Sequence, residues 1–238
     1  MNLPCANVSV IVLSGGFGTR LRSALADQPK CLAPVCGRAF IDYLLESVAA
    51  AGFEHVVLAT GYLAGEVQQH CKEGQDWGLK ISYSREEEPL GTAGAMRLAE
   101  PICRGDIVIV MNGDSHVSVS FEKLLSYHAR HQGAATMVLA EVQDRRRFGT
   151  VEFERGGRVI RFEEKGGHGA GWVNAGVYAL DREVLNSVPE GNVSFEHVTL
   201  PSLLSSHDLY ALPVESELVD IGTPDSLASA QSYLGFDA

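Results

Sequence analysis

Short apolar runs alternate with helix-like segments along the first half of this 238-residue chain. The runs hold aliphatic and β-branched residues over five or six positions, which is typical of strands in an α/β sheet. We predict strands at residues 9–13, 55–60, 80–84 and 106–111. Three of them are followed at once by serine, glycine or asparagine, and these residues indicate a turn at the end of the strand.

Between these strands, apolar residues recur with the spacing of an amphipathic helix. In segment 39–51, one helical face carries Ile41, Leu44, Leu45 and Val48. Comparable segments predict helices at 63–71, 92–99 and 121–131. Because strands and helices alternate, we expect a Rossmann-like α/β fold with a mostly parallel sheet and helices on both faces.

The second half has a different pattern. Four strands are predicted without helices between them, at 134–142, 149–153, 159–163 and 173–180, and two glycine-rich turns separate the last three. Such a series indicates an antiparallel extension of the sheet, over the pocket. Helices return at 195–204 and 224–234. No repeat or linker is visible, so we expect a single domain over residues 1–238.

The composition of the chain limits the kinds of partner and compartment that we expect. The chain has 19 basic and 30 acidic residues, a net charge of −11, which disfavours nucleic acid and anionic membranes as partners. No apolar run approaches the roughly 20 residues of a membrane span, and the first residues lack the features of a secretory signal. Five cysteines without a C-x-x-C pair are typical of reduced thiols. We therefore expect a cytoplasmic protein.

A glycine-rich turn follows the first strand. Residues 14–20 read Ser-Gly-Gly-Phe-Gly-Thr-Arg, and Lys30 lies ten residues beyond Arg20. Glycines without a Cβ let backbone N–H groups approach phosphate oxygens, although such a turn can also be purely structural. Leu21 occupies the third glycine position of a dinucleotide fingerprint, which disfavours a nicotinamide-dependent oxidoreductase, and no Gly-Lys-Ser/Thr of a P-loop is present.

Two aspartates each follow an apolar stretch. Asp114 comes after Asn112-Gly113, and Asp220 comes after Leu218-Val219. Asn-Gly-Asp is ordinary turn chemistry, but a carboxylate at the end of a strand is also a common way to hold Mg²⁺ over phosphates. Magnesium takes one or two protein carboxylates and leaves its other positions to phosphate and water, so two such aspartates fit.

Together these segments resemble the signature of the sugar-1-phosphate nucleotidyltransferases. That pattern is Gly-Gly-x-Gly-Thr-Arg-Leu followed by Pro-Lys and Pro-Val, matched here by residues 15–21, 29–30 and 34–35. Asn-Gly-Asp at 112–114 and Asp-x-Gly-Thr-Pro at 220–224 extend the resemblance over nearly the whole chain. Segments 20–23 and 27–30 are most similar to the D-manno-heptose 1-phosphate guanylyltransferases.

The resemblance implies a nucleotide-binding half at about 1–115 and a sugar-binding half at about 116–238. It implies catalytic roles for Arg20 at the leaving pyrophosphate, Lys30 at the α-phosphate, and Asp114. Asp114 and Asp220 would bind Mg²⁺ or another divalent cation. The implied nucleotide-binding residues are Leu13, Ser14, Gly15, Gly16, Gly18, Thr19, Arg20, Lys30, Glu87, Glu88, Pro89, Gly91, Thr92, Gly94, Asn112 and Gly113. The implied sugar-phosphate-binding residues are Gly149, Glu164, Lys165, Asn174 and Gly176.

Three consecutive glutamates, residues 86–88, directly precede the small-residue segment 89–95. A carboxylate can accept hydrogen bonds from the N1–H and the exocyclic amine of guanine together, a donor pair that adenine lacks. We expect Glu87 or Glu88 to read guanine in this way. A solvated acidic loop is the alternative, and the basic run Arg145-Arg146-Arg147 is likewise interpreted as a solvated loop.

The implied reaction is nucleotidyl transfer. A sugar 1-phosphate is already an anion at neutral pH, so its attack on the α-phosphorus of a nucleoside triphosphate needs no general base. GTP and D-manno-heptose 1-phosphate are the expected substrates. The alternatives are a mannose- or glucose-1-phosphate enzyme using GTP, UTP, CTP or dTTP, and a non-catalytic nucleotide-sugar-binding regulator. Homo-oligomerisation stays open.

Overall fold

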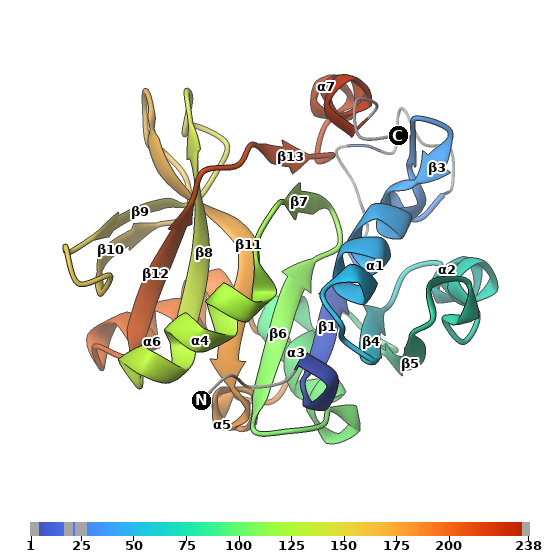
Figure 1. Ribbon diagram of the computed structural model, residues 1–238, viewed down its shortest axis with the longest axis horizontal. Helices are drawn as coiled ribbons and strands as arrows, with labels where there is room; N and C mark the ends of the chain where they lie inside the picture. The colour runs from blue at the N-terminus through green and yellow to red at the C-terminus, as the bar shows by residue number, and fades with distance from the viewer. Residues whose placement is uncertain (1–4, 17–20, 22–27, 235–238) are drawn as a thin grey trace.

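A nine-stranded sheet forms the centre of the computed structural model, which describes residues 5–16, 21 and 28–234 (Figure 1). Its main path runs β10-β9-β11-β6-β1-β4-β5, and β8 and β12 are attached to it through the pairs β11–β8 and β8–β12. The strands are β1 (Ser9–Leu13), β4 (His55–Thr60), β5 (Lys80–Arg85), β6 (Ile107–Asn112), β8 (Ala135–Val142), β9 (Thr150–Phe153), β10 (Val159–Glu163), β11 (Gly171–Asp181) and β12 (Leu209–Val214).

Seven α-helices and one π-helix accompany the sheet in the part of the chain that the structure describes. The α-helices are α1 (Phe40–Ala50), α2 (Ala64–Cys71), α3 (Gly91–Ala99), α4 (Phe121–His131), α5 (Arg182–Ser187), α6 (Leu200–Ser205) and α7 (Pro224–Leu234), and the π-helix is η5 (Phe195–Thr199). No helix within the described ranges is long and apolar enough to cross a bilayer.

The predicted α/β class is confirmed, including the mixed character of the sheet. Strands β5, β4, β1 and β6 are parallel neighbours in that order. β11 then runs antiparallel to β6, and β9 and β10 continue the antiparallel part. The strands stand third, second, first and fourth in chain order along the parallel part, which is the order of a Rossmann half-sheet.

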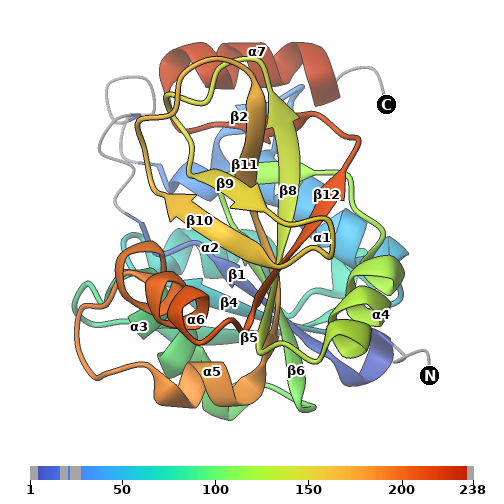
Figure 2. The ribbon, with the colours of Figure 1, turned by 90° about the vertical axis from the view of Figure 1, so that its left-hand side faces the viewer.

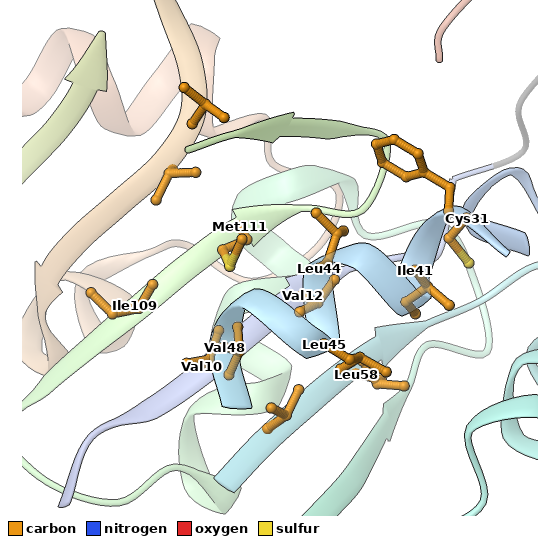
Figure 3. Close-up of a cluster of buried hydrophobic side chains, with 14 of the residues drawn as sticks. Val10, Val12, Cys31, Ile41, Leu44, Leu45, Val48, Leu58, Ile109 and Met111 are labelled. Atoms are coloured by element: carbon orange, nitrogen blue, oxygen red, sulfur yellow. The ribbon is translucent and has the colours of Figure 1, made fainter. Parts of the chain in front are cut away.

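The alternation of side chains along β1 explains why its sequence is apolar throughout. Val10 and Val12 belong to the cluster formed with α1, α2 and α4, whereas Ile11 belongs to the cluster formed with α3, α5 and α6. Figure 3 shows part of the first cluster, where Ile41, Leu44, Leu45 and Val48 of α1 lie over the sheet. Figure 2 shows α4 on one side of the sheet and α3, α5 and α6 on the other. A strand buried on both faces reads as a continuous apolar run.

Several short elements were not predicted. β12 is parallel to β8. It contains Pro213, and a proline within an apolar run argues against a strand at the sequence level. β7 (Ser115–Val117) pairs with β13 (Leu218–Asp220), and β2 (Pro34–Val35) pairs with β3 (Arg38–Ala39). The helix predicted at 195–204 is divided into η5 and α6, and α5 was missed. The four short strands have two or three residues each, and α5 and α6 have six residues each, less than two helical turns. Such lengths are too short for a periodic pattern to emerge.

His128 connects α4 to two strands of the sheet. Its side chain is 2% exposed, with Nδ1 3.0 Å from the Thr136 hydroxyl and Nε2 3.2 Å from an Asp181 carboxylate oxygen. Burial lowers the pKa of His128, and this effect outweighs the attraction of Asp181 for the protonated ring. The folded protein therefore favours neutral His128.

We predict that this histidine contributes to acid sensitivity. Because its pKa is lower in the folded than in the unfolded state, the unfolded chain binds more protons below about pH 6.5, and the free energy of unfolding falls as the pH drops through that window. Between pH 7.5 and pH 5.5, the free energy of unfolding measured by urea denaturation should fall less in His128→Gln than in the wild type. His168→Gln, at an exposed position, is the control, and an unchanged pH dependence in His128→Gln would contradict the assignment.

Candidate active site

A cavity of about 340 Å³ opens at the carboxyl ends of β1 and β6. These strands are paired in parallel, with Leu13 beside Asn112, so both chains leave the sheet at the same level. In open α/β sheets, ligands bind where neighbouring connections leave in opposite directions, as they do here. The lining residues are Leu13, Ser14, Gly15, Gly16, Lys30, Cys31, Ala59, Glu86, Pro89, Gly91, Thr92, Ala95, Asn112, Gly113, Asp114 and Asn192.

The turn after β1 forms one wall. The N–H and hydroxyl of Ser14 both donate to the carbonyl of Ala59, at 2.8 and 3.0 Å, which fastens the turn to β4. A Cβ at Gly15 would lie 2.6 Å from Oε1 of Glu86 and 3.2 Å from the backbone N of Gly61, whereas one at the exposed Gly16 would meet no atom of the described residues within 4 Å. The close approach of Glu86 and of the end of β4 therefore favours glycine at position 15. The predicted site residues Gly18, Thr19 and Arg20 lie outside the described residues, as do segments 22–23 and 27.

Lys30 and Asp114 meet in the cavity. Lys30 begins the 3₁₀ turn η2 (Lys30–Leu32) after Pro29, and its ammonium forms an ion pair with the Asp114 carboxylate that follows β6. The two side chains are 15% and 41% exposed. A lysine and a carboxylate from segments 84 residues apart are thus brought together. This pair supplies the cavity with one cation and one anion.

Cys31 was not predicted to line the cavity. It is buried, and burial raises the pKa of its thiol to about 12. Only the thiolate is a strong nucleophile, so Cys31 is chemically inert at neutral pH.

The floor of the cavity depends on glycines that permit close packing. The N–H of Gly113 donates to the carbonyl of Leu13 at 2.9 Å, and a Cβ at Gly113 would collide with that oxygen. Gly176 of β11 has φ +75°, and a Cβ there would lie 2.5 Å from Nδ2 of Asn112. Gly176 therefore lies directly behind the cavity wall formed by Asn112.

The opposite wall is built from both halves of the chain. The backbone N–H of Ala93 donates to Val193 at 2.9 Å, and the hydroxyl of Thr92 donates to Glu196 at 2.9 Å while accepting from the N–H of Phe195 at 2.7 Å. Because of this docking, Asn192 lines the cavity although 100 residues separate it from Thr92. Gly94 does not line the cavity; a Cβ there would lie 2.6 Å from the Gly191 carbonyl.

Among the three glutamates, Glu86 lines the cavity. Its Oε2 accepts from the N–H of Leu90 at 2.9 Å, and partial burial raises the pKa of the carboxyl. Glu87 and Glu88 are exposed and line an adjoining depression, which also borders Gly15 and Glu86. Sequence reasoning identified the acidic run but not the member that faces the cavity.

Asp220 lies next to Asp114 through the pairing of β13 with β7. Asp220 pairs with Ser115, and the N–H of Ile221 donates to the carbonyl of Asp114 at 3.0 Å. One carboxylate oxygen of Asp220 accepts from the N–H of Gly222 at 2.9 Å, and the other forms an ion pair with Arg147. The two predicted metal ligands therefore come from neighbouring backbone segments.

Oxygen donors of this kind suit magnesium. Within the described ranges, no group of three or more His, Cys, Asp or Glu side chains forms a metal site. Two carboxylates are sufficient for Mg²⁺, which keeps water and phosphate oxygens in its remaining positions. Asp114 and Asp220 fit that requirement in donor type and number: Asp114 lines the cavity, and Asp220 pairs with Ser115, the residue after Asp114.

The predicted sugar-phosphate residues lie on or beside β9, β10 and β11: Gly149 precedes β9, Glu164 and Lys165 follow β10, and Asn174 and Gly176 are within β11. The N–H of Asn174 donates to the carbonyl of Gly149 at 2.8 Å, and a Cβ on Gly149 would lie 3.6 Å from the carbonyl of Glu164. Oε2 of Glu164 lies against Nε2 of His197, and Nζ of the exposed Lys165 is 3.8 Å from the other oxygen of Glu164. The side chain of Asn174 bonds to Tyr178 and to the N–H of Gly176.

Residues 9–235 match the nucleotidyl transferase family model. The chain therefore belongs to the nucleotidyl transferase family. It is 36% identical to a mannose-1-phosphate guanylyltransferase of Mycobacterium tuberculosis over 95% of this chain, and spans 64% of that relative's length. It is 33% identical to the D-glycero-α-D-manno-heptose 1-phosphate guanylyltransferase of Aneurinibacillus thermoaerophilus, over 95% of this chain and 98% of that one.

The fold of this chain is also similar to that of solved structures. HddC from Yersinia pseudotuberculosis superposes with a TM-score of 0.86 at 28% identity, over 95% of this chain and 99% of HddC. A structure of HddC complexed with GMP-PN superposes with a TM-score of 0.83 at 27% identity and the same coverage.

We predict that Gly176→Ala destabilises the protein and weakens nucleotide binding. The left-handed backbone costs a side chain about 1–2 kcal/mol, and the methyl group would also displace Asn112 from the cavity wall. Gly169→Ala is a matched control, because Gly169 has φ +69° but open space where a Cβ would lie. Urea denaturation and nucleotide titration measure both effects. Equal nucleotide affinity in the two variants would contradict a role for the Gly176–Asn112 contact.

Proposed function

We propose that the protein transfers GMP from GTP to D-glycero-D-manno-heptose 1-phosphate, forming GDP-heptose and pyrophosphate. The observation that carries this proposal is the Lys30–Asp114 pair in a cavity at the β1–β6 strand ends of a nucleotidyl transferase. The relative from A. thermoaerophilus and the GMP-PN complex of HddC support the choice of sugar and base.

In this reaction an oxygen of the sugar phosphate forms a bond to the α-phosphorus of GTP. The bond from that phosphorus to the bridging oxygen breaks, and pyrophosphate leaves with its electron pair. Two anions must approach each other, so orientation and positive charge carry the catalysis. Lys30 would neutralise the α-phosphate region, and the backbone of Gly15 and Gly16 would hold phosphate oxygens. Arg20 and Gly18 are proposed on sequence grounds for the same phosphates.

Asp114 and Asp220 would hold a divalent cation, which when bound offsets the negative charge of the phosphates. Lys165 would bind the phosphate of the incoming sugar, and Glu164 would accept hydrogen bonds from sugar hydroxyls. The contacts among Gly149, Glu164 and Asn174 support a common wall for the sugar. We assign the reaction to the cytoplasm, because all five cysteines lie within the described residues and are unpaired.

For the base, we propose Glu86 as the residue that reads guanine. Its carboxylate borders the cavity beside Pro89 and Gly91, and the N–H of Leu90 fixes one of its oxygens. A carboxylate in that position accepts from guanine N1–H and N2–H, whereas the N1 lone pair of adenine would face it with like charge. Asn192 lines the same cavity, and its amide would donate to a base oxygen.

Mannose 1-phosphate is the second candidate acceptor, because the M. tuberculosis relative is named for it and is 36% identical. Mannose and D-manno-heptose share their ring configuration and differ in the chain beyond C5. The two candidates therefore require the same base and the same reaction.

The reaction is tested by pyrophosphate release with five nucleoside triphosphates against heptose, mannose and glucose 1-phosphates. GTP with the heptose 1-phosphate should exceed every other pair by about tenfold or more, the factor expected from one well-made hydrogen bond to a charged group. Asp114→Asn is the inactive control. Faster turnover of mannose 1-phosphate would select the second candidate, and no release with any pair would favour a non-catalytic nucleotide-sugar-binding regulator.

The role of Glu86 predicts a change in base preference. In Glu86→Gln, kcat/KM for GTP should fall by about 10- to 100-fold, because an amide replaces one carboxylate acceptor with a donor. Glu87→Gln and Glu88→Gln are matched controls on the adjoining exposed positions and should retain GTP preference. If either control lost GTP preference while Glu86→Gln kept it, the base would be read by the neighbour, as the sequence predicts.

A further inference from the structure

The three consecutive arginines have three different environments. Arg146 is 67% exposed and pairs with Asp144, as expected of a solvated loop. Arg145 is half-buried, and its guanidinium donates to the carbonyls of His168 and Gly169 at 2.6 and 3.3 Å. Arg147 reaches across to Asp220. The segment is a loop, as predicted, but Arg145 and Arg147 also bond to other parts of the protein, which the sequence did not indicate.

The Arg147–Asp220 contact involves only one of the two carboxylate oxygens. The N–H of Gly222 holds Oδ1 within the turn after β13, and Arg147 bonds to Oδ2 and, at 3.3 Å, to the Ser226 hydroxyl. Asp220 is 16% exposed and Arg147 is 43% exposed. Asp220 therefore keeps its position through its own turn, and Arg147 is the partner that can leave.

A mostly buried carboxylate requires a positive charge nearby, because its removal from water is costly when it is unpaired. Before a metal arrives, Arg147 meets this need at Asp220, which is 16% exposed, and Lys30 pairs with Asp114, which is 41% exposed. Each proposed metal ligand thus forms an ion pair with a basic side chain of the protein. Lys30 is one of the proposed catalytic groups, so Arg147 is the member whose separate role can be tested.

Arg147 also stands at the sugar side of the site. It precedes Phe148, whose ring centre lies 5.7 Å from the guanidinium carbon, and it is two residues from Gly149. Gly149 lies close to Glu164, the neighbour of Lys165, since a Cβ added at Gly149 would be 3.6 Å from the Glu164 carbonyl oxygen. Arg145 fastens the same segment to the loop that follows Lys165. A guanidinium released from Asp220 thus remains near the proposed sugar-phosphate wall, and its planar donors suit a phosphate.

We propose that Arg147 is an exchangeable counterion: it neutralises Asp220 until a divalent cation binds there, and the released guanidinium then binds the phosphate of the incoming sugar. This inference rests on the proposed function, because it uses Asp220 as a metal ligand and a sugar phosphate as the acceptor. It makes Arg147 a group that opposes metal binding and favours sugar binding. If Arg147 only supported the fold, its removal would weaken both metal binding and sugar binding.

The first test measures Mn²⁺ binding to the full chain without substrates, by electron paramagnetic resonance of the free ion. Arg147→Met should bind Mn²⁺ about three- to tenfold more tightly, since the competing cation is gone. Arg147→Lys retains a positive charge and should remain near the wild type. Arg146→Met is the matched control and should not change the affinity, and Asp220→Asn should weaken it.

The second test measures the KM of the sugar 1-phosphate at saturating GTP and metal. Arg147→Met should raise this KM by about tenfold, the loss expected of one charge-assisted contact, while Arg147→Lys recovers part of it. Circular dichroism verifies that each variant is folded, and Arg147→Gln replaces the methionine variant if that one is not.

The outcomes separate this inference from the proposed function. Unchanged or weaker Mn²⁺ binding in Arg147→Met, with the expected loss in Asp220→Asn, overturns the counterion role alone. Unchanged binding in Asp220→Asn removes the metal assignment of the proposed function. Tighter Mn²⁺ binding together with an unchanged sugar KM overturns the transfer of Arg147 to the sugar phosphate.

Discussion

The parallel pairing of β1 with β6 is the constraint on which the site depends. Leu13 lies beside Asn112, so the glycine turn after β1 and the Asn-Gly-Asp turn after β6 leave the sheet at one level. The bond from the Gly113 N–H to the Leu13 carbonyl then locks the two turns together. Everything else at the cavity is added to this pair: Lys30 reaches Asp114, and the pairing of β7 with β13 brings Asp220 to the same edge.

Much of the fold could be predicted because its parallel strands are buried on both faces and its helices are amphipathic. Those patterns are local, and they fixed the class and most boundaries. β12 was not predicted, because Pro213 interrupts its apolar run. η5 and α6 were predicted as one helix, because their combined apolar pattern is continuous. Tertiary pairing decides such short elements, and a single sequence does not display it.

The candidate site also contains residues that the sequence predicts and residues that only the tertiary structure identifies. Lys30, Asp114 and Asn112 belong to motifs in the sequence, as do Gly15, Gly16 and Gly113, and the structure brings all of them to one cavity. Asn192 carries no motif, since only the docking of Thr92 against Phe195 and Glu196 brings it there. The choice among the three glutamates and the three arginines also depends on packing: neighbours of identical type differ only in the direction that the backbone gives them.

The wall shared by Thr92 and Glu196 has a mechanical consequence. β11, from the second half of the chain, lies within the same sheet as β6, and Gly176 packs behind Asn112. A hinge that swings one half against the other would break both the sheet and the wall. The two halves of the chain are therefore joined by backbone pairing within one sheet and by side-chain contacts across one wall. A substitution at the wall, in either half, is felt by the other half because the two share the same packing.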